Sequence, residues 1–431
     1  MKSSDYKISL FAAILININI MLGAGIFINT AELAKRAGVL GAFGYPAVAL
    51  LMLPLILSVA ALLRLHPGGG FYQFGAREIA PFAGFISSWS YFVGKLASAA
   101  IMIHASVLLS QQVIPAMGAC NGLFIDMMVL TCFTLLNLLN VRIGSSLQAL
   151  FMGMKMVPII FVVLLGLFFF SGVNLGEAHW VWEGLPSVMP LVLYATVGFE
   201  AACSLSSKIE NAEKNAPRAV LYSFGFVVCA AFLYQLFFYG VLGDALARLV
   251  DYRAIFPAFV TAIFSGNRHV LAALLQLFAA SSALGGSYGI LFSNNWNLHT
   301  LAQHGHTFGS TLLRRLNAHG IPAACVVIEG AVCAFYLVVT RGNQIPLQQI
   351  AALGCVLAFL ISALSLLTSR MRAGVLVRVL IPSLALVSCV VLGANCVQQL
   401  FLTGLAPFFY FAVLLTLGVG MFLATAVRSR F

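Results

Sequence analysis

The chain has 431 residues, of which 61% are hydrophobic and only 8% are charged. An ordinary soluble domain carries about a quarter charged residues, so a soluble protein is excluded. The formal charge of +11 is a possible sign of a nucleic-acid partner, but in a membrane protein an excess of Lys and Arg usually sets the orientation. We therefore expect contact with membrane lipid and no nucleic-acid partner.

Hydrophobic runs recur along almost the whole chain and are separated by short polar or Gly/Pro-containing connections. One bilayer crossing needs roughly 20 mostly apolar residues, so the sequence predicts an all-α polytopic membrane protein with about 12 transmembrane helices. The first run continues past Gly25 without a small-residue cleavage site, which indicates a retained span and not a signal peptide. The predicted spans are 8–33, 39–63, 82–113, 122–140, 145–171, 185–207, 218–242, 269–297, 321–340, 346–368, 375–396 and 405–427.

The distribution of basic residues predicts the orientation. An even number of spans puts both termini on the same side of the membrane. With the termini in the cytoplasm, fifteen of the 23 Lys and Arg face inward and six face outward, while Lys95 and Lys155 lie within spans. Since cytoplasmic loops carry the excess of basic residues, we expect both termini in the cytoplasm. The sequence contains no Asn-x-Ser/Thr acceptor site, which is consistent with a bacterial inner membrane.

Two predicted spans, the first and the sixth, contain glycine near their middle. The first has Gly23-Ala24-Gly25, and the sixth has Thr196-Val197-Gly198-Phe199-Glu200. Glycine inside a helix costs about 1 kcal/mol relative to alanine, although a single such motif is also typical of close helix packing. Each of these spans is the first of five successive helices. Paired interruptions at corresponding positions of an inverted repeat predict a binding site near the membrane midplane.

Unwound backbone at these two places would expose unpaired main-chain groups. Amide N–H groups and the positive end of a half-helix attract a carboxylate, while free carbonyl groups accept hydrogen bonds from an ammonium group. The predicted ligand is therefore a zwitterion, such as an amino acid, bound by the main chain.

Four stretches in chain order resemble motifs of the amino acid/polyamine/organocation permeases. Gly23-Ala24-Gly25-Ile26-Phe27 resembles the family's GxGIF-type motif in helix 1, and Pro67-Gly68-Gly69-Gly70-Phe71-Tyr72 resembles its P-x-G-G-x-Y loop. Gly198-Phe199-Glu200-Ala201 resembles its helix 6 break. The segment 210–218 resembles the E-x-x-N-P-x-x-x-P-R type loop, but it has Asn215-Ala216-Pro217 where the family more often has an earlier Asn-Pro pair.

The resemblance implies the leucine-transporter-like fold, a five-plus-five inverted repeat with broken helices 1 and 6. The first repeat would be residues 1–172, the second 173–370, and the peripheral helices 11 and 12 would lie in 371–431. It also implies a secondary active transporter of amino acids or related amines, and not an enzyme, that works by alternating access. Proton-coupled symport and substrate exchange both remain open, as do an arginine-agmatine type antiporter and a non-transporting substrate sensor.

The breaks and the resemblance together give a set of expected site residues. Glu200 is the expected proton carrier, because a Glu at this place is implicated in pH-dependent transport in some relatives; the alternative is a carboxylate that only tethers helix ends. In some proton-coupled relatives a lysine at the position of Lys155 takes the place of a sodium ion against helices 1 and 8; the alternative is a lysine paired structurally with a carbonyl. The expected substrate-binding residues are Met21, Gly23, Ala24, Gly25, Ile26, Phe27, Tyr194, Thr196, Val197, Gly198 and Phe199.

Other polar residues inside the spans are weaker candidates. Lys95 could meet a substrate carboxylate or Glu200, or could be a structural lysine. Ser282 lies on a small-residue face suited to contact with broken helix 1, and Tyr194 either closes over the substrate or only packs. Glu329 is expected to pair with another helix. Four histidines between 299 and 319 lack support from Cys or carboxylate groups, so we expect no metal site and no cofactor.

Overall fold

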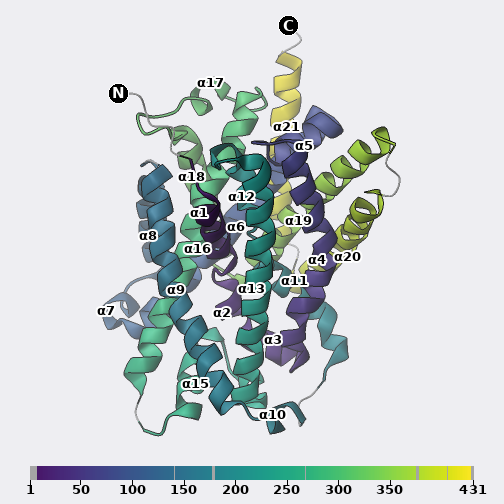
Figure 1. The fold of residues 1–431 in the computed structure, drawn as a ribbon. Coiled ribbons are helices and arrows are strands. Elements are labelled where there is room, and N and C mark those ends of the chain that lie inside the picture. The colour runs from purple at the N-terminus through teal and green to yellow at the C-terminus, as the bar shows by residue number, and fades with distance from the viewer. Residues whose placement is uncertain are drawn as a thin grey trace.

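The computed structural model describes residues 7–139, 141–176, 180–266, 268–374, 378–404 and 406–428. The described chain is mostly helical (Figure 1). Among the described residues, β pairing is limited to an isolated bridge between Ile8 and Ile209. Three short 3₁₀ helices, η1 (Trp182–Gly184), η2 (Ser206–Lys208) and η3 (Tyr252–Ala254), accompany the α-helices. The α-helices are α1 (Leu10–Met21), α2 (Gly25–Ile28), α3 (Thr30–Ala37), α4 (Leu40–Leu65), α5 (Phe71–Glu78), α6 (Pro81–Val113), α7 (Pro115–Gly118), α8 (Gly122–Leu136), α9 (Val141–Phe169), α10 (Val173–Gly176), α11 (Leu185–Thr196), α12 (Ala201–Ser204), α13 (Ala212–Leu242), α14 (Asp244–Ala247), α15 (Ile255–Ile263), α16 (His269–Gln303), α17 (Ser310–Leu313), α18 (Ala323–Thr340), α19 (Gln344–Arg372), α20 (Leu380–Thr403) and α21 (Ala406–Arg428).

The described residues contain 11 segments that are long and apolar enough to cross a membrane. Each coincides with a predicted span, and the prediction of a polytopic all-α membrane protein is confirmed. The remaining predicted span, 122–140, corresponds to α8, which has only 15 residues. At 1.5 Å per residue α8 rises about 22 Å, less than the roughly 30 Å hydrocarbon core. The first residues of the predicted spans 375–396 and 405–427 lie outside the described ranges.

The start of α1 and the end of α21 lie at the same end of the helix bundle, together with α5 and α17 (Figure 1). We call this the terminal end. The helices α3, α10 and α15 lie at the other end, which we call the opposite end. This arrangement fits an even number of crossings. The prediction that the terminal end faces the cytoplasm stays a prediction, and residues 1–6 and 429–431 lie outside the described chain.

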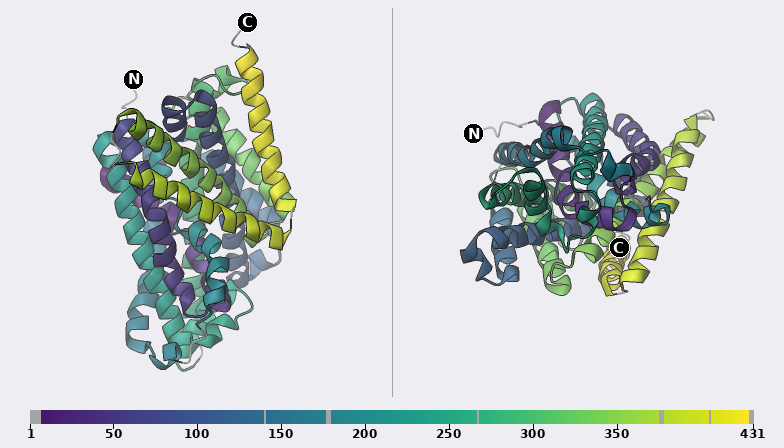
Figure 2. Two further views of the ribbon diagram at one scale, coloured as in Figure 1. Left: turned by 90° about the vertical axis from the view of Figure 1, so that its right-hand side faces the viewer. Right: turned by 90° about the horizontal axis from the view of Figure 1, so that it is seen from below.

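The helices differ sharply in how much of their surface other helices cover. In the apolar window of α6, 89% of the residues are buried inside the protein, whereas in α21 only 17% are buried. Figure 2 shows α20 and α21 running along the outside of the bundle. Among the candidate spans, α6 is thus the most covered and α21 the least, whereas α20 is covered as much as α9, at 33%. The division into two repeats at residues 172 and 370 stays a prediction.

Two glycines bring α6 and α19 into backbone contact. A β-carbon on Gly94 would lie 2.8 Å from the Cα of Gly354, and one on Gly354 would lie 2.7 Å from the Cα of Gly94. Membrane helices use such small residues because van der Waals packing, and not burial of apolar surface, drives their association. Since Lys95 and Cys355 follow these glycines directly, the contact also sets how α6 and α19 approach the interrupted helices.

We expect Gly94→Ala to destabilise the protein by about 1 to 3 kcal/mol, because the added methyl group cannot be accommodated without moving a backbone. Thermal unfolding in detergent measures the effect. Gly225→Ala in α13 is the matched control, since a β-carbon there meets nothing within 4 Å and alanine favours a helix by about 1 kcal/mol. Equal melting temperatures for the two variants would contradict a tight contact at Gly94.

Candidate functional site

The two predicted breaks are present and lie against each other. The first helix stops at Met21 and restarts at Gly25 as α2, while the sixth stops at Thr196 and restarts at Ala201 as α12. Gly198 has φ +142°, a backbone conformation that side chains rarely adopt. A β-carbon on Gly198 would lie 2.9 Å from the amide nitrogen of Met21. Glycine is thus required at position 198 both by the backbone angle and by the close approach of the two backbone segments.

The break between α1 and α2 leaves main-chain donors unused. Within the described chain, the amides of Gly23, Ala24 and Gly25 donate no hydrogen bond. All three residues are buried, and buried backbone N–H groups are nearly always paired in folded proteins. Three adjacent unpaired donors in the protein interior, at the start of a helical segment, form a suitable place for a carboxylate.

Lys155 of α9 holds the other side of the same break. Its Nζ donates to the carbonyl oxygens of Asn19 at 2.5 Å and Leu22 at 2.7 Å, with the Ser282 carbonyl at 3.5 Å. The hydroxyl of Ser282 in α16 also donates to Leu22 O, at 2.8 Å. The Lys155 side chain is completely buried. The ammonium group therefore satisfies carbonyl oxygens at the end of α1 and joins α9 and α16 to α1; its role in place of a sodium ion stays a prediction.

Lys95 and Glu200 form an ion pair in the interior. Lys95 Nζ lies 2.9 Å from Glu200 Oε1, and their side chains are 2% and 0% exposed. The other carboxylate oxygen, Oε2, accepts a 2.7 Å hydrogen bond from the amide of Gly198. Of the two partners that the sequence allowed for Lys95, the structure shows Glu200. The pair links α6 to the break in the sixth helix and cancels two charges that would be costly to bury alone.

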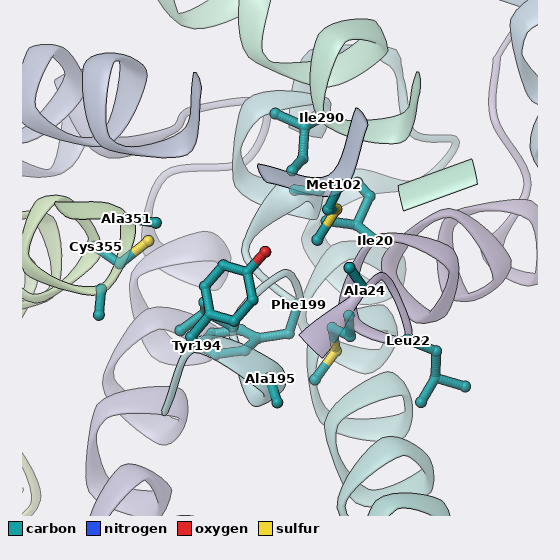
Figure 3. Close-up of a cluster of buried hydrophobic side chains, with 14 of the residues drawn as sticks. Ile20, Leu22, Ala24, Met102, Tyr194, Ala195, Phe199, Ile290, Ala351 and Cys355 are labelled. Carbon is teal, nitrogen blue, oxygen red and sulfur yellow. The ribbon is translucent and has the colours of Figure 1, made fainter. Parts of the chain in front are cut away.

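Apolar side chains fill the space beside the two breaks (Figure 3). The figure shows the hydroxyl of Tyr194 directed toward Met102, with Ala351 and Cys355 of α19 on one side and Ala24 on the other. Sequence reasoning missed Met102. The available signal was its spacing of seven residues from Lys95, which places both side chains on the same face of α6. This signal is weak because every long helix contains such pairs.

Some predicted site residues present their main chain to the breaks while their side chains point elsewhere. The hydroxyl of Thr196 donates within its own helix, to Val192 O at 2.9 Å. The ring of Phe27 packs edge-on against Tyr234 at a centroid distance of 5.5 Å, toward α13. Ile26 and Val197 are buried apolar residues. These residues can shape the breaks but supply no polar side chain to them.

Outside the breaks, Glu329 of α18 is completely buried and has no ion-pair partner among the described residues. Its polar neighbour is Asn295 of α16. In the described chain, no group of three or more His, Cys, Asp or Glu could hold a metal ion.

At the opposite end, Asn29 closes the approach to the breaks. Its side-chain amide donates to Leu191 O of α11 at 3.1 Å, and its Oδ1 accepts from Gln348 of α19 at 3.1 Å and from Gln344 at 3.3 Å. A pocket of about 180 Å³ lies directly outside this contact and is lined in part by Asn29, Glu32 and Asp251. The fully buried Asn29 thus separates a polar surface pocket from the breaks.

At the terminal end, a second set of hydrogen bonds joins loops to helices. The Tyr72 hydroxyl of α5 and Nε2 of His306 lie 2.8 Å apart. Asn297 of α16 donates to the Ser204 hydroxyl of α12 at 2.8 Å. Since contacts also close the opposite end, the breaks are covered from both sides.

Acid should weaken the terminal-end contact. Burial, followed by the charge of His304, lowers the pKa of His306 below 6.5. The folded state binds this proton less readily than the unfolded chain, so its stabilising contribution is complete above about pH 6.5 and is lost as the pH falls through the lowered pKa. We expect the melting temperature to drop more between pH 7.5 and 5 in the native protein than in His306→Gln. The exposed His319→Gln is the control; a pH response unchanged in His306→Gln would contradict the assignment.

Comparison with known proteins gives a family match over nearly the whole chain. The profile of a family described as "Amino acid permease" matches residues 8–427. Curated relatives named only as uncharacterized transporters occur in Mycobacterium bovis and in two strains of Mycobacterium tuberculosis. Each is 25% identical over 397 residues, which covers 90% of this chain and 85% of the relative.

Proposed function

The chain belongs to the amino acid permease family, and from this premise we propose that it moves an amino acid or a related amine by secondary active transport with alternating access. The observation that carries the proposal is the set of three buried, unpaired amides at Gly23, Ala24 and Gly25. These donors suit the α-carboxylate of a substrate. Across the contact, the carbonyls of Gly198 and Glu200 already accept from the amides of Ala201 and Cys203, so the α-amine would bind the carbonyls of Val197 and Phe199.

Alternating access requires the contacts at the two ends to open in turn. Opening of the Asn29 contacts would connect the breaks to the polar pocket at the opposite end, and opening of the Tyr72–His306 contact would expose them to the terminal end. In this proposal the two repeats, 1–172 and 173–370, move against each other while 371–431 stays peripheral. The terminal end faces the cytoplasm of a bacterial inner membrane.

Protons are the proposed coupling ion, with Glu200 as the group that binds them and Lys155 as a fixed cation. A proton on Glu200 would remove the negative partner of Lys95 and weaken the hold of the carboxylate on the Gly198 amide. Lys155 would keep α1 attached to α9 and α16, as a fixed cation in a site made of carbonyl groups. A change in charge at Glu200 would shift the balance between the two access states, because those states solvate the ion pair differently.

Uptake into proteoliposomes tests the proposal. A panel of radiolabelled amino acids and amines is supplied with and without an inward proton gradient, and with or without unlabelled compound preloaded. Accumulation driven by the gradient supports proton symport. Uptake stimulated only by preloaded substrate supports exchange, including the arginine-agmatine type. Saturable binding without movement would contradict transport and support a sensor.

A further inference from the structure

We propose that the substrate is an amino acid with an uncharged, apolar side chain, which lies in a cluster formed by Ile20, Leu22, Ala24, Met102, Ile290 and Ala351. We call this set the side-chain cluster. The inference rests on the proposed function and names the substrate class for the same site. All six residues are 3% exposed or less. Figure 3 shows Ile20 and Ala24 next to Met102 with Ile290 above them, whereas Ala351 lies beyond Tyr194 and Leu22 points away on the other side.

The position of the carboxylate determines where the substrate side chain lies. The unpaired amides at 23–25 lie next to Leu22 and Ala24, so a carboxylate bound there places the rest of the substrate within reach of the side-chain cluster. Met102 covers this position: a β-carbon on Gly23 would lie 2.9 Å from its sulfur, and one on Gly286 would lie 2.8 Å from the same atom. The thioether thus occupies the contact between the first break and α16.

Among the described residues, the ionisable groups near the breaks are already engaged in contacts, so a charged substrate side chain would find no free partner among them. Glu200 is engaged by Lys95 and by the Gly198 amide, so it is not available to a second cation. Lys95 in turn has its charge balanced, and Lys155 is surrounded by carbonyls of α1 and α16. An arginine, lysine, agmatine or glutamate side chain would lose its hydration in the side-chain cluster without gaining a partner.

Met102 also suggests how a range of apolar side chains is accepted. Methionine is unbranched and flexible and adapts to irregular spaces. It can move away from Gly23 and Gly286 to make room for a substrate, whereas Ala24 and Ala351 have no freedom to do so. Met102 therefore sets the size limit of the site, and the small residues Ala24 in the first break and Ala351 on α19 set its width.

Competition against uptake of labelled leucine into proteoliposomes tests the inference. Unlabelled methionine, isoleucine, valine and phenylalanine should compete at least about 10-fold better than arginine, lysine, glutamate or agmatine, since a charged group is costly to bury in an apolar site without a partner. In Met102→Ala, phenylalanine should gain about 10-fold as a competitor over alanine, compared with the same ratio in the native protein. Met102→Leu, which conserves volume, should keep the native order, and Met128→Ala on the exposed surface of α8 is the control.

The outcomes separate this inference from the proposed function. If arginine, agmatine or glutamate competes best, the substrate class is wrong while the transporter proposal stands. If Met102→Ala and Met128→Ala leave the same order of preference, Met102 does not set the size limit and the proposed cluster is wrong. If none of the amino acids or amines moves across the membrane, the proposed function itself fails.

Discussion

Replacing Lys155 by methionine is expected to reduce substrate uptake by at least about 100-fold. The fully buried ammonium group makes short hydrogen bonds to two carbonyl oxygens of the first break. Hydrogen bonds to charged groups contribute about 1.5 to 3 kcal/mol each, and buried acceptors that lose their partner are costly. Without the lysine, α1 would lose its attachment to α9, and the backbone at Leu22 would no longer be held for substrate. Initial uptake rates at equal amounts of reconstituted protein measure the loss.

Two further variants separate the charge of Lys155 from its packing. Lys214→Met removes an exposed lysine at the start of α13 and should leave uptake unchanged. Lys155→Ala leaves the carbonyls of Asn19, Leu22 and Ser282 and the Ser282 hydroxyl facing the emptied position, and oxygen ligands of this kind suit hard cations. If sodium ions partly restore substrate uptake by Lys155→Ala, the position of the ammonium group requires a positive charge. Native uptake by Lys155→Met would contradict an essential role.

The fold was largely predictable because bilayer crossing imposes a strong pattern on composition. Twenty apolar residues per span and the excess of basic residues in alternate loops are properties of the chain alone. The breaks were predictable for a similar reason, since glycine in mid-span is unfavourable unless the structure uses it. The exact length of α8 was less predictable: Leu138 and Leu139 extend the apolar pattern beyond Asn137, but the helix ends at Leu136.

Partners within the site were harder to predict, because they depend on how helices far apart in sequence rotate against each other. The sequence showed that Lys95 and Glu200 are ionisable groups inside spans, but it left two partners open for Lys95. The choice depends on how α6 lies against the break in the sixth helix, where Lys95 Nζ is 2.9 Å from Glu200 Oε1. Met102 was missed for the same reason: its spacing of seven residues from Lys95 is too common a signal to mark one methionine among 13 as the residue against a break.

The second large effect concerns the buried pair of Lys95 and Glu200. Each single variant, Lys95→Met or Glu200→Gln, should lower stability by about 3 to 5 kcal/mol, because it leaves one charge in the interior without its partner. The double variant should recover most of this loss, since it removes both charges. In addition, the side-chain carbonyl introduced by Glu200→Gln can still accept a hydrogen bond from the Gly198 amide. Chemical or thermal unfolding in detergent gives the four stabilities of the cycle, and we expect a coupling energy of at least about 2 kcal/mol.

The partly exposed pair of Glu32 and Arg36 within α3 provides the control cycle. Their side chains lie 2.7 Å apart but are 31% and 19% exposed, and such pairs contribute no more than about 1 kcal/mol. A coupling energy at Lys95 and Glu200 as small as that of the control would contradict a dry ion pair. Transport then tests the role of the charge: a double variant that folds but no longer responds to a proton gradient supports proton binding at Glu200. A double variant that still couples to protons would place the proton carrier elsewhere, and Glu200 would serve only to hold α6 against the break.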